Sequence, residues 1–118
     1  MDVMLMGNLS HTFSAYFKRV ATPAIVLAVL SERPMYGYEI VSEIAKRSGG
    51  KYTVSIMYPI LNGLHKEGYI AEGETVIIEG RARKYYCITP EGTRYLQTVR
   101  REFKELSDIF FSFTGGDV

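Results

Sequence analysis

The sequence predicts a mostly helical α+β domain, and three observations lead to this fold class. Apolar residues recur at helical spacing before residue 70 and again after residue 89. Between them, β-branched residues and a period of two predict one hairpin of two strands. Proline and glycine stand where helices are expected to begin and end. The expected order is therefore four helices, two strands and one last helix.

Two helices are expected in the first 31 residues. One face of a helix over residues 9–20 is marked by apolar side chains at i, i+4, i+7, i+8 and i+11: Leu9, Phe13, Tyr16, Phe17 and Val20. Thr22 followed by Pro23 has the pattern of a cap and a first helical residue. A second, mostly buried helix is therefore expected over residues 24–31.

The next two helices are expected over residues 36–47 and 54–67. Pro34 separates the first of them from the preceding helix, and Gly49 and Gly50 follow its end. The second ends before Gly68. Its cap is either Thr53 or Ser55, between which the sequence does not decide. If Thr53 is the cap, Pro59 lies inside the helix and costs it one backbone hydrogen bond.

A hairpin is expected between residues 69 and 89. Residues 75–78 are all β-branched, residues 79–82 predict a turn, and residues 83–89 alternate between two faces of a strand. Compact helices followed directly by a hairpin are typical of a winged helix-turn-helix. We therefore expect four segments, an N-terminal amphipathic helix (1–20), a winged helix DNA-binding domain (21–89), a C-terminal dimerisation helix (90–113) and a tail (114–118).

The last helix carries an apolar stripe with the 3, 4 spacing of a coiled-coil seam. Its residues are Leu96, Val99, Phe103, Leu106, Phe110 and Phe113. Thr89 and Pro90 mark the start of the helix, which would be longer than the small body before it. Because soluble monomers avoid large exposed apolar patches, we expect a second copy to cover the stripe. Phe13 and Phe17 would add a further layer. The alternative is that the helix folds back on its own domain.

The helix over residues 54–67 is the candidate for reading DNA bases in the major groove. Its polar face would present hydroxyl, amide, imidazole and ammonium groups: Ser55, Tyr58, Asn62, His65 and Lys66. Tyr58 could instead be a packing residue, and His65 and Lys66 could be ordinary surface residues.

The turn of the hairpin is the candidate wing. Arg81, Arg83 and Lys84 place three positive charges in four residues, and Gly80 permits a tight turn. A wing beside the phosphate backbone needs such a cluster. The alternative is an ordinary solvated turn.

Composition sets limits on function. The net charge is only +1 in 118 residues, so binding to DNA must depend on local basic clusters. A single cysteine, Cys87, excludes an internal disulfide, and we interpret it as a neutral strand thiol rather than a redox switch. The N-terminus lacks the basic start of a signal peptide, so we expect a cytoplasmic protein without membrane contact. No catalytic constellation, zinc spacing or phosphate-binding loop is present, so we expect no enzyme, metal or cofactor.

Three spaced motifs resemble the PadR family of transcription regulators. They are Tyr36–Ile40, Met57–Leu61 with Leu64–Ile70, and Gly80–Tyr86 with Ile88–Gly92. The similarity extends over residues 21 to about 112 and includes the compact C-terminal region of one PadR-like subgroup. It implies a homodimeric, sequence-specific DNA-binding repressor with Tyr58 on the DNA-facing helix and residues 80–84 as the wing.

The resemblance also implies a small aromatic effector. Some relatives bind flat ligands between their subunits against an aromatic residue of the last helix, and Phe103 falls near that position. Here an apolar cavity could be lined by Phe13, Phe17, Phe103 and Phe110, although the chain contains no tryptophan to stack on the ligand. The alternative is a plainly packed dimer core. A winged helix that contacts another protein instead of DNA is the remaining alternative for the whole chain.

Overall fold

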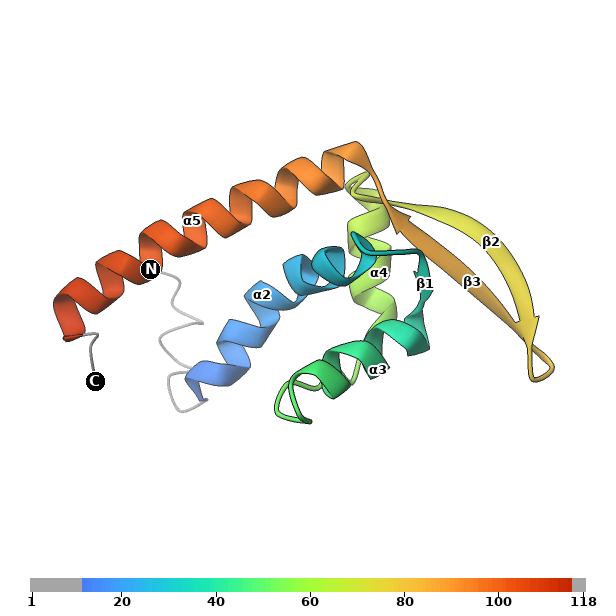
Figure 1. Cartoon of the computed structure of the whole chain (residues 1–118), viewed down its shortest axis with the longest axis horizontal. Coiled ribbons are helices and arrows are strands. Elements are labelled where there is room, and N and C mark those ends of the chain that lie inside the picture. The colour runs from blue at the N-terminus through green and yellow to red at the C-terminus, as the bar shows by residue number, and fades with distance from the viewer. Residues whose placement is uncertain (1–11, 116–118) are drawn as a thin grey trace.

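The computed structural model describes residues 12–115 and confirms the mostly helical α+β class (Figure 1). The helices are α2 (Phe13–Leu30), α3 (Gly37–Arg47), α4 (Tyr58–Lys66) and α5 (Pro90–Thr114). The strands are β1 (Met35–Tyr36), β2 (Ile70–Ile78) and β3 (Arg81–Ile88). Leu9, where the first helix was expected to begin, and the tail beyond residue 115 lie outside the described residues.

The two helices expected before residue 32 are one continuous helix, so the predicted break at Thr22–Pro23 is wrong. Pro23 lies inside α2, where it removes one backbone donor. The buried Thr22 side chain does not act as a cap. Its hydroxyl donates to the Lys18 carbonyl and also bonds the Tyr52 hydroxyl at 2.6 Å. The second contact ties α2 to the loop before α4.

Helix α4 is shorter than predicted and begins at Tyr58 rather than near Val54. Pro59 therefore occupies the first turn, where its missing N–H costs no helical bond. A second correction concerns Tyr36, which was expected to start a helix. It belongs to the two-residue strand β1 and caps α3, with Glu39 Oε1 accepting a hydrogen bond from the Tyr36 amide at 3.3 Å.

The three strands form an antiparallel sheet with β3 in the centre, and the long β2–β3 hairpin projects from the body as a wing (Figure 1). Both strands are longer at one end than predicted. Their turn contains only Glu79 and Gly80, both with positive φ (52° and 76°), between the paired Ile78 and Arg81. Two positive φ angles define the turn whose twist matches a hairpin, so the sharp tip follows from this backbone.

The core lies where α2, α3 and α4 meet the base of the sheet. Its largest fully buried side chains are Val26, Leu27, Met35, Ile40 and Ile70. Among the described helices, α2 is the one whose length and composition would permit a membrane span. It supplies two of these core residues, as expected for the central helix of a folded domain.

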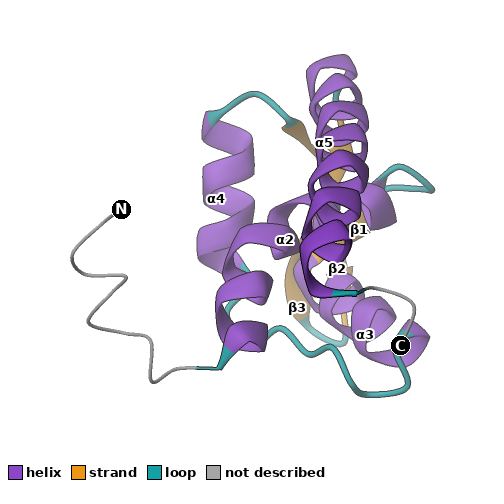
Figure 2. Cartoon of the chain, turned by 90° about the vertical axis from the view of Figure 1, so that its left-hand side faces the viewer, coloured by secondary structure: helices purple, strands orange, loops and turns teal. Residues whose placement is uncertain are grey.

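Helix α5 starts against the body and ends beyond it. Thr89 caps its first turn by accepting a hydrogen bond from the Gly92 amide at 3.0 Å. A Cβ atom at the buried Gly92 would lie 2.1 Å from the Tyr69 carbonyl oxygen, so only glycine permits this approach. Further along, the helix extends past the other described elements (Figures 1 and 2).

Candidate nucleic-acid interface

Helix α4 has an apolar back and a polar front. Leu61 and Leu64 are buried in the core, which fixes the rotation of the helix about its axis. On the opposite side lie four of the five residues predicted to read DNA, all of them exposed: Tyr58, Asn62, His65 and Lys66. The fifth, Ser55, is exposed in the loop before α4 and not on the helix. The exposed face offers hydroxyl, amide and imidazole groups on a rigid element.

The loop that leads from α3 to α4 is fixed to two helices. Ser48 Oγ accepts a hydrogen bond from the Tyr52 amide at 2.9 Å and donates to the Tyr52 carbonyl at 3.2 Å. The Tyr52 hydroxyl reaches Thr22 on α2, and Lys18 Nζ lies 5.3 Å from the centre of the Tyr52 ring. The position of α4 therefore depends on α2 as well as on its own core contacts.

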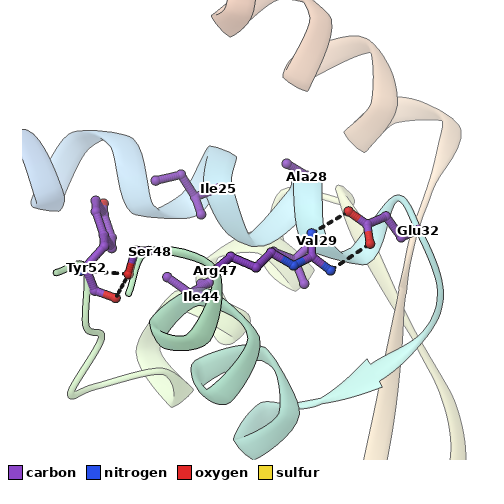
Figure 3. Close-up of a pocket in the computed structure, with 8 residues that line it drawn as sticks. All are labelled: Ile25, Ala28, Val29, Glu32, Ile44, Arg47, Ser48 and Tyr52. Carbon is purple, nitrogen blue, oxygen red and sulfur yellow. Dashed lines mark hydrogen bonds and ion pairs between the residues drawn. The ribbon is translucent and has the colours of Figure 1, made fainter. Parts of the chain in front are cut away.

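Tyr52 also borders a hollow of about 340 Å³ between α2 and α3, which Figure 3 shows. Its floor is apolar and includes Ile25 and Ile44. At its rim Arg47 forms a two-pronged ion pair with Glu32 at 2.6 and 2.7 Å and also contacts Glu43. This pair ties the end of α2 to the end of α3 and lowers the pKa of Glu32, chiefly through the hydrogen bond from Arg47.

The three predicted wing cations occupy three different environments. Arg81 is exposed beside the turn. Arg83 lies over the Tyr36 ring, with Cζ 5.2 Å from the ring centre. Lys84 Nζ pairs with Glu72 Oε2 across the two strands at 3.2 Å, and this contact raises the pKa of Lys84. The cluster seen in the sequence is thus spread along the wing rather than gathered at its tip.

The wing also carries carboxylates that the prediction did not consider. Glu72 and Glu74 lie on β2 and Glu79 lies in the turn, all three exposed. The positive side chains therefore belong to β3 and most of the negative ones to β2. A partner that is negatively charged would favour the β3 side. The hairpin was predicted, but not its register, which is irregular between Glu72 and Thr75 and brings Glu72 alongside Lys84.

The predicted dimer residues on α5 divide into two groups. Leu96 packs against the core, and Val99 is half-buried facing α2. The predicted residues further along the helix are all exposed: Phe103, Leu106, Phe110 and Phe113, the last of them to 87%. The predicted stripe is therefore covered by the chain itself at one end and open to solvent at the other.

Of the four residues predicted to line a ligand pocket, the structure brings two together in one hollow. A hollow of about 560 Å³ between α2 and α5 is lined by Phe17 and Phe103, whose ring centres are 5.8 Å apart. Phe13 stacks on Phe17 but does not line this hollow, and neither does Phe110. Val20 and Leu96 contribute to its apolar wall instead. In the described part of the chain, no group of three metal-ligating side chains comes together.

Residues 26–98 match the transcriptional regulator PadR-like family. The chain belongs to this family. The chain is also 30% identical to the transcriptional regulator Rv3488 of Mycobacterium tuberculosis, over 77% of this chain and 83% of that protein. An uncharacterized protein of Lysinibacillus sphaericus is 32% identical over 79% of this chain and 87% of its own length.

Solved structures agree with this PadR-like assignment. A transcriptional regulator from Clostridium thermocellum has a TM-score of 0.75 at 30% identity, with 82% of this chain and 96% of that chain covered. A PadR family regulator from Eggerthella lenta has a TM-score of 0.74, also at 30% identity, with 86% and 84% covered. The family consists of DNA-binding transcription regulators rather than enzymes, so the chain acts in transcription regulation.

Proposed function

We propose that this PadR-like chain is a cytoplasmic homodimeric repressor that recognises a specific DNA sequence. The dimer proposal depends on the far half of α5, from Phe103 to Phe113. Phe103, Leu106, Phe110 and Phe113 are at least half exposed on a helix that extends beyond the body. Such a stripe is costly in water and fits a second copy of the same helix. The near half of α5 orients the helix relative to α4, so a symmetric pair would present two recognition helices.

In the proposed complex, α4 enters the major groove and the wing follows the backbone. Tyr58, Asn62, His65 and Lys66 face the bases and nearby phosphates, and Ser55 lies at the approach. Arg81, Arg83 and Lys84 provide the positive charges of the wing. Because the net charge of the chain is close to zero, most of its affinity for DNA would come from these positions.

The test is a fluorescence titration with duplexes from the region upstream of the gene for this protein. Binding should weaken steeply as salt increases. Arg83→Ala combined with Lys84→Ala should weaken binding to all sequences, while Asn62→Ala should change the sequence preference. If the wild-type protein binds no duplex at low salt, the DNA function is wrong, and a protein partner for the winged helix becomes the better explanation.

We further propose that a small planar aromatic compound releases the repressor from DNA. The hollow between α2 and α5 supports this proposal, because it is apolar, lined by Phe17 and Phe103, and large enough for such a ligand. A ligand there would change the angle between α5 and α2, and it could act only by favouring one subunit spacing. Planar aromatic compounds should raise the melting temperature of the wild-type protein and of Phe110→Ala, but not that of Phe103→Ala. If no compound stabilises the wild-type protein, the hollow is only part of the dimer core.

A further inference from the structure

A third hollow, of about 320 Å³ and with polar as well as apolar residues in its lining, lies where the starts of α3 and α4 meet the middle of β3. We refer to it as the wing notch and define it by Tyr38, Tyr58, Arg83 and Lys84, which line it together with mostly apolar residues. Tyr38 and Tyr58 are each 68% exposed, although they are large aromatic residues. Tyr38 was not predicted as a site residue, because in the sequence it is an ordinary position of a helix.

Arg83 is held in position before any partner binds. Its guanidinium lies over Tyr36, and the Tyr36 ring contacts the Tyr85 ring edge-on with centres 5.3 Å apart. Tyr36 itself is fixed by pairing of β1 with β3. Among the described residues Arg83 forms no ion pair, and its buried Nε has no hydrogen-bond partner. The guanidinium therefore keeps donor groups that the chain itself does not use.

The notch is suited to an anion. None of the residues that line it is acidic. Glu72, which pairs with Lys84, is not among the residues that line the notch. Tyr38 of α3, Tyr58 of α4 and Arg83 of β3 thus line one hollow that contains no carboxylate to neutralise the guanidinium. Charge-assisted hydrogen bonds from such donors favour phosphate oxygens.

We propose that the wing notch binds one phosphate of the DNA backbone, with Arg83 as the charged donor and the Tyr38 hydroxyl as a second donor. This inference rests on the proposed DNA-binding function and adds a contact that the sequence did not reveal. A phosphate held between α3, α4 and β3 sets the depth of α4 in the groove and carries no base information. Tyr38 and Arg83 therefore position the recognition helix, while Asn62 and its neighbours read the sequence.

The test compares two substitutions with two matched controls. Tyr38→Phe removes only a hydroxyl, and Arg83→Gln removes the guanidinium, with its charge and its donor groups. The controls Tyr95→Phe and Arg101→Gln make the same changes on α5, at residues that do not line the wing notch. Binding of the full-length protein is measured by fluorescence anisotropy on two unrelated duplexes of about three helical turns each, at several salt concentrations.

Arg83→Gln should bind both duplexes about tenfold more weakly. Its salt slope should fall by about 0.9 for each phosphate lost, once per subunit. Tyr38→Phe should bind both duplexes about threefold more weakly with an unchanged slope, and the controls should match the wild type. If the wild type binds DNA but both variants bind equally well, the notch proposal is wrong and the DNA function stands. If the wild type binds neither duplex, the DNA function itself fails.

Two further measurements locate the phosphate. When single phosphates are replaced by neutral methylphosphonates, several positions should weaken the wild type, and at one of them per half-site Arg83→Gln should show no additional loss. Additive losses at every position would overturn the proposal. Inorganic phosphate at constant ionic strength should compete weakly and equally with wild type and Arg83→Gln. If it displaces the duplex from the wild type alone, the notch is a site for the free ion instead.

Discussion

The two halves of helix α5 carry the same spacing of apolar residues but lie in different surroundings. In the near half, Gly92 is buried against the sheet and Leu96 packs against the core. In the far half, Leu106, Phe110 and Phe113 are exposed. The difference shows that periodicity identifies an apolar stripe but not what covers it. The body of the chain covers the first part, and in our proposal a second copy covers the rest.

The largest expected effect comes from introducing charged residues into the far half of α5. Leu106→Asp combined with Phe110→Asp should give a folded monomer that binds DNA more than about a hundredfold more weakly. Carboxylates in an apolar interface lose their hydration without gaining partners, and a monomer loses the second half-site. Sedimentation velocity and DNA titration measure the two effects. Arg101→Asp, on the polar side of the same helix, should remain dimeric. A double variant that stays dimeric places the interface elsewhere.

Substitutions in the near half of α5 should change the stability of the domain itself. Gly92→Ala should destabilise the protein by about 3 kcal/mol, because the added Cβ would overlap the Tyr69 carbonyl. The melting temperature should fall by about 10 °C or more. Gly63→Ala on α4 is the control. Nothing lies within 4 Å of its Cβ position, so it should stabilise the helix by up to about 1 kcal/mol. Equal effects of the two substitutions would contradict the packing at Gly92.

A pair of truncations compares the halves directly. Leu96→Ala should lower the free energy of unfolding by about 1–2 kcal/mol at any protein concentration, because it removes contacts within one chain. Phe113→Ala should leave the body unchanged and weaken only the dimer, so its effect on the melting temperature should depend on concentration. Thermal unfolding over a range of concentrations separates the two. If the effect of Leu96→Ala on the melting temperature depended on protein concentration, Leu96 would be covered by the second copy and not by its own chain.

The smallest effect is expected from the ion pair between Glu32 and Arg47, in the part of the domain that supports the near half of α5. Arg47 lowers the pKa of Glu32, so this pair contributes stability that is present above the unfolded-state pKa of Glu32 and is lost as pH falls. Glu32→Gln should therefore melt slightly lower than the wild type at pH 7 and equally at pH 3. Both groups are exposed, so high salt should reduce the difference. A difference that persists at pH 3 would show that packing, not charge, is lost.

Much of the fold could be predicted because its signals are local. The Thr89–Pro90 cap and the stripe from Leu96 to Phe113 place α5 to within about one residue. The continuity of α2 could not be predicted, because Thr22 has the sequence pattern of a cap and its actual partner, Tyr52, is 30 residues away. Strand β1 exists only through its pairing with β3, which no short window of sequence contains.

The candidate site shows the same division. The polar face of α4 follows from helical spacing, and the exposed Tyr58, Asn62, His65 and Lys66 lie as that spacing predicts. The different surroundings of Arg83 and Lys84 could not be predicted from spacing. They depend on Tyr36 and Glu72, which the sheet brings alongside. Tyr38 was missed for a similar reason. Only the meeting of α3, α4 and β3 makes it part of a polar hollow.

The central claim, that two copies pack along the far half of α5, is tested most directly by the mass of the wild-type protein in solution. Light scattering should give twice the 13.4 kDa mass of one chain at micromolar concentration, and the same mass per duplex when the protein is bound to DNA. A mass of a single chain at that concentration, with DNA binding intact, would contradict it.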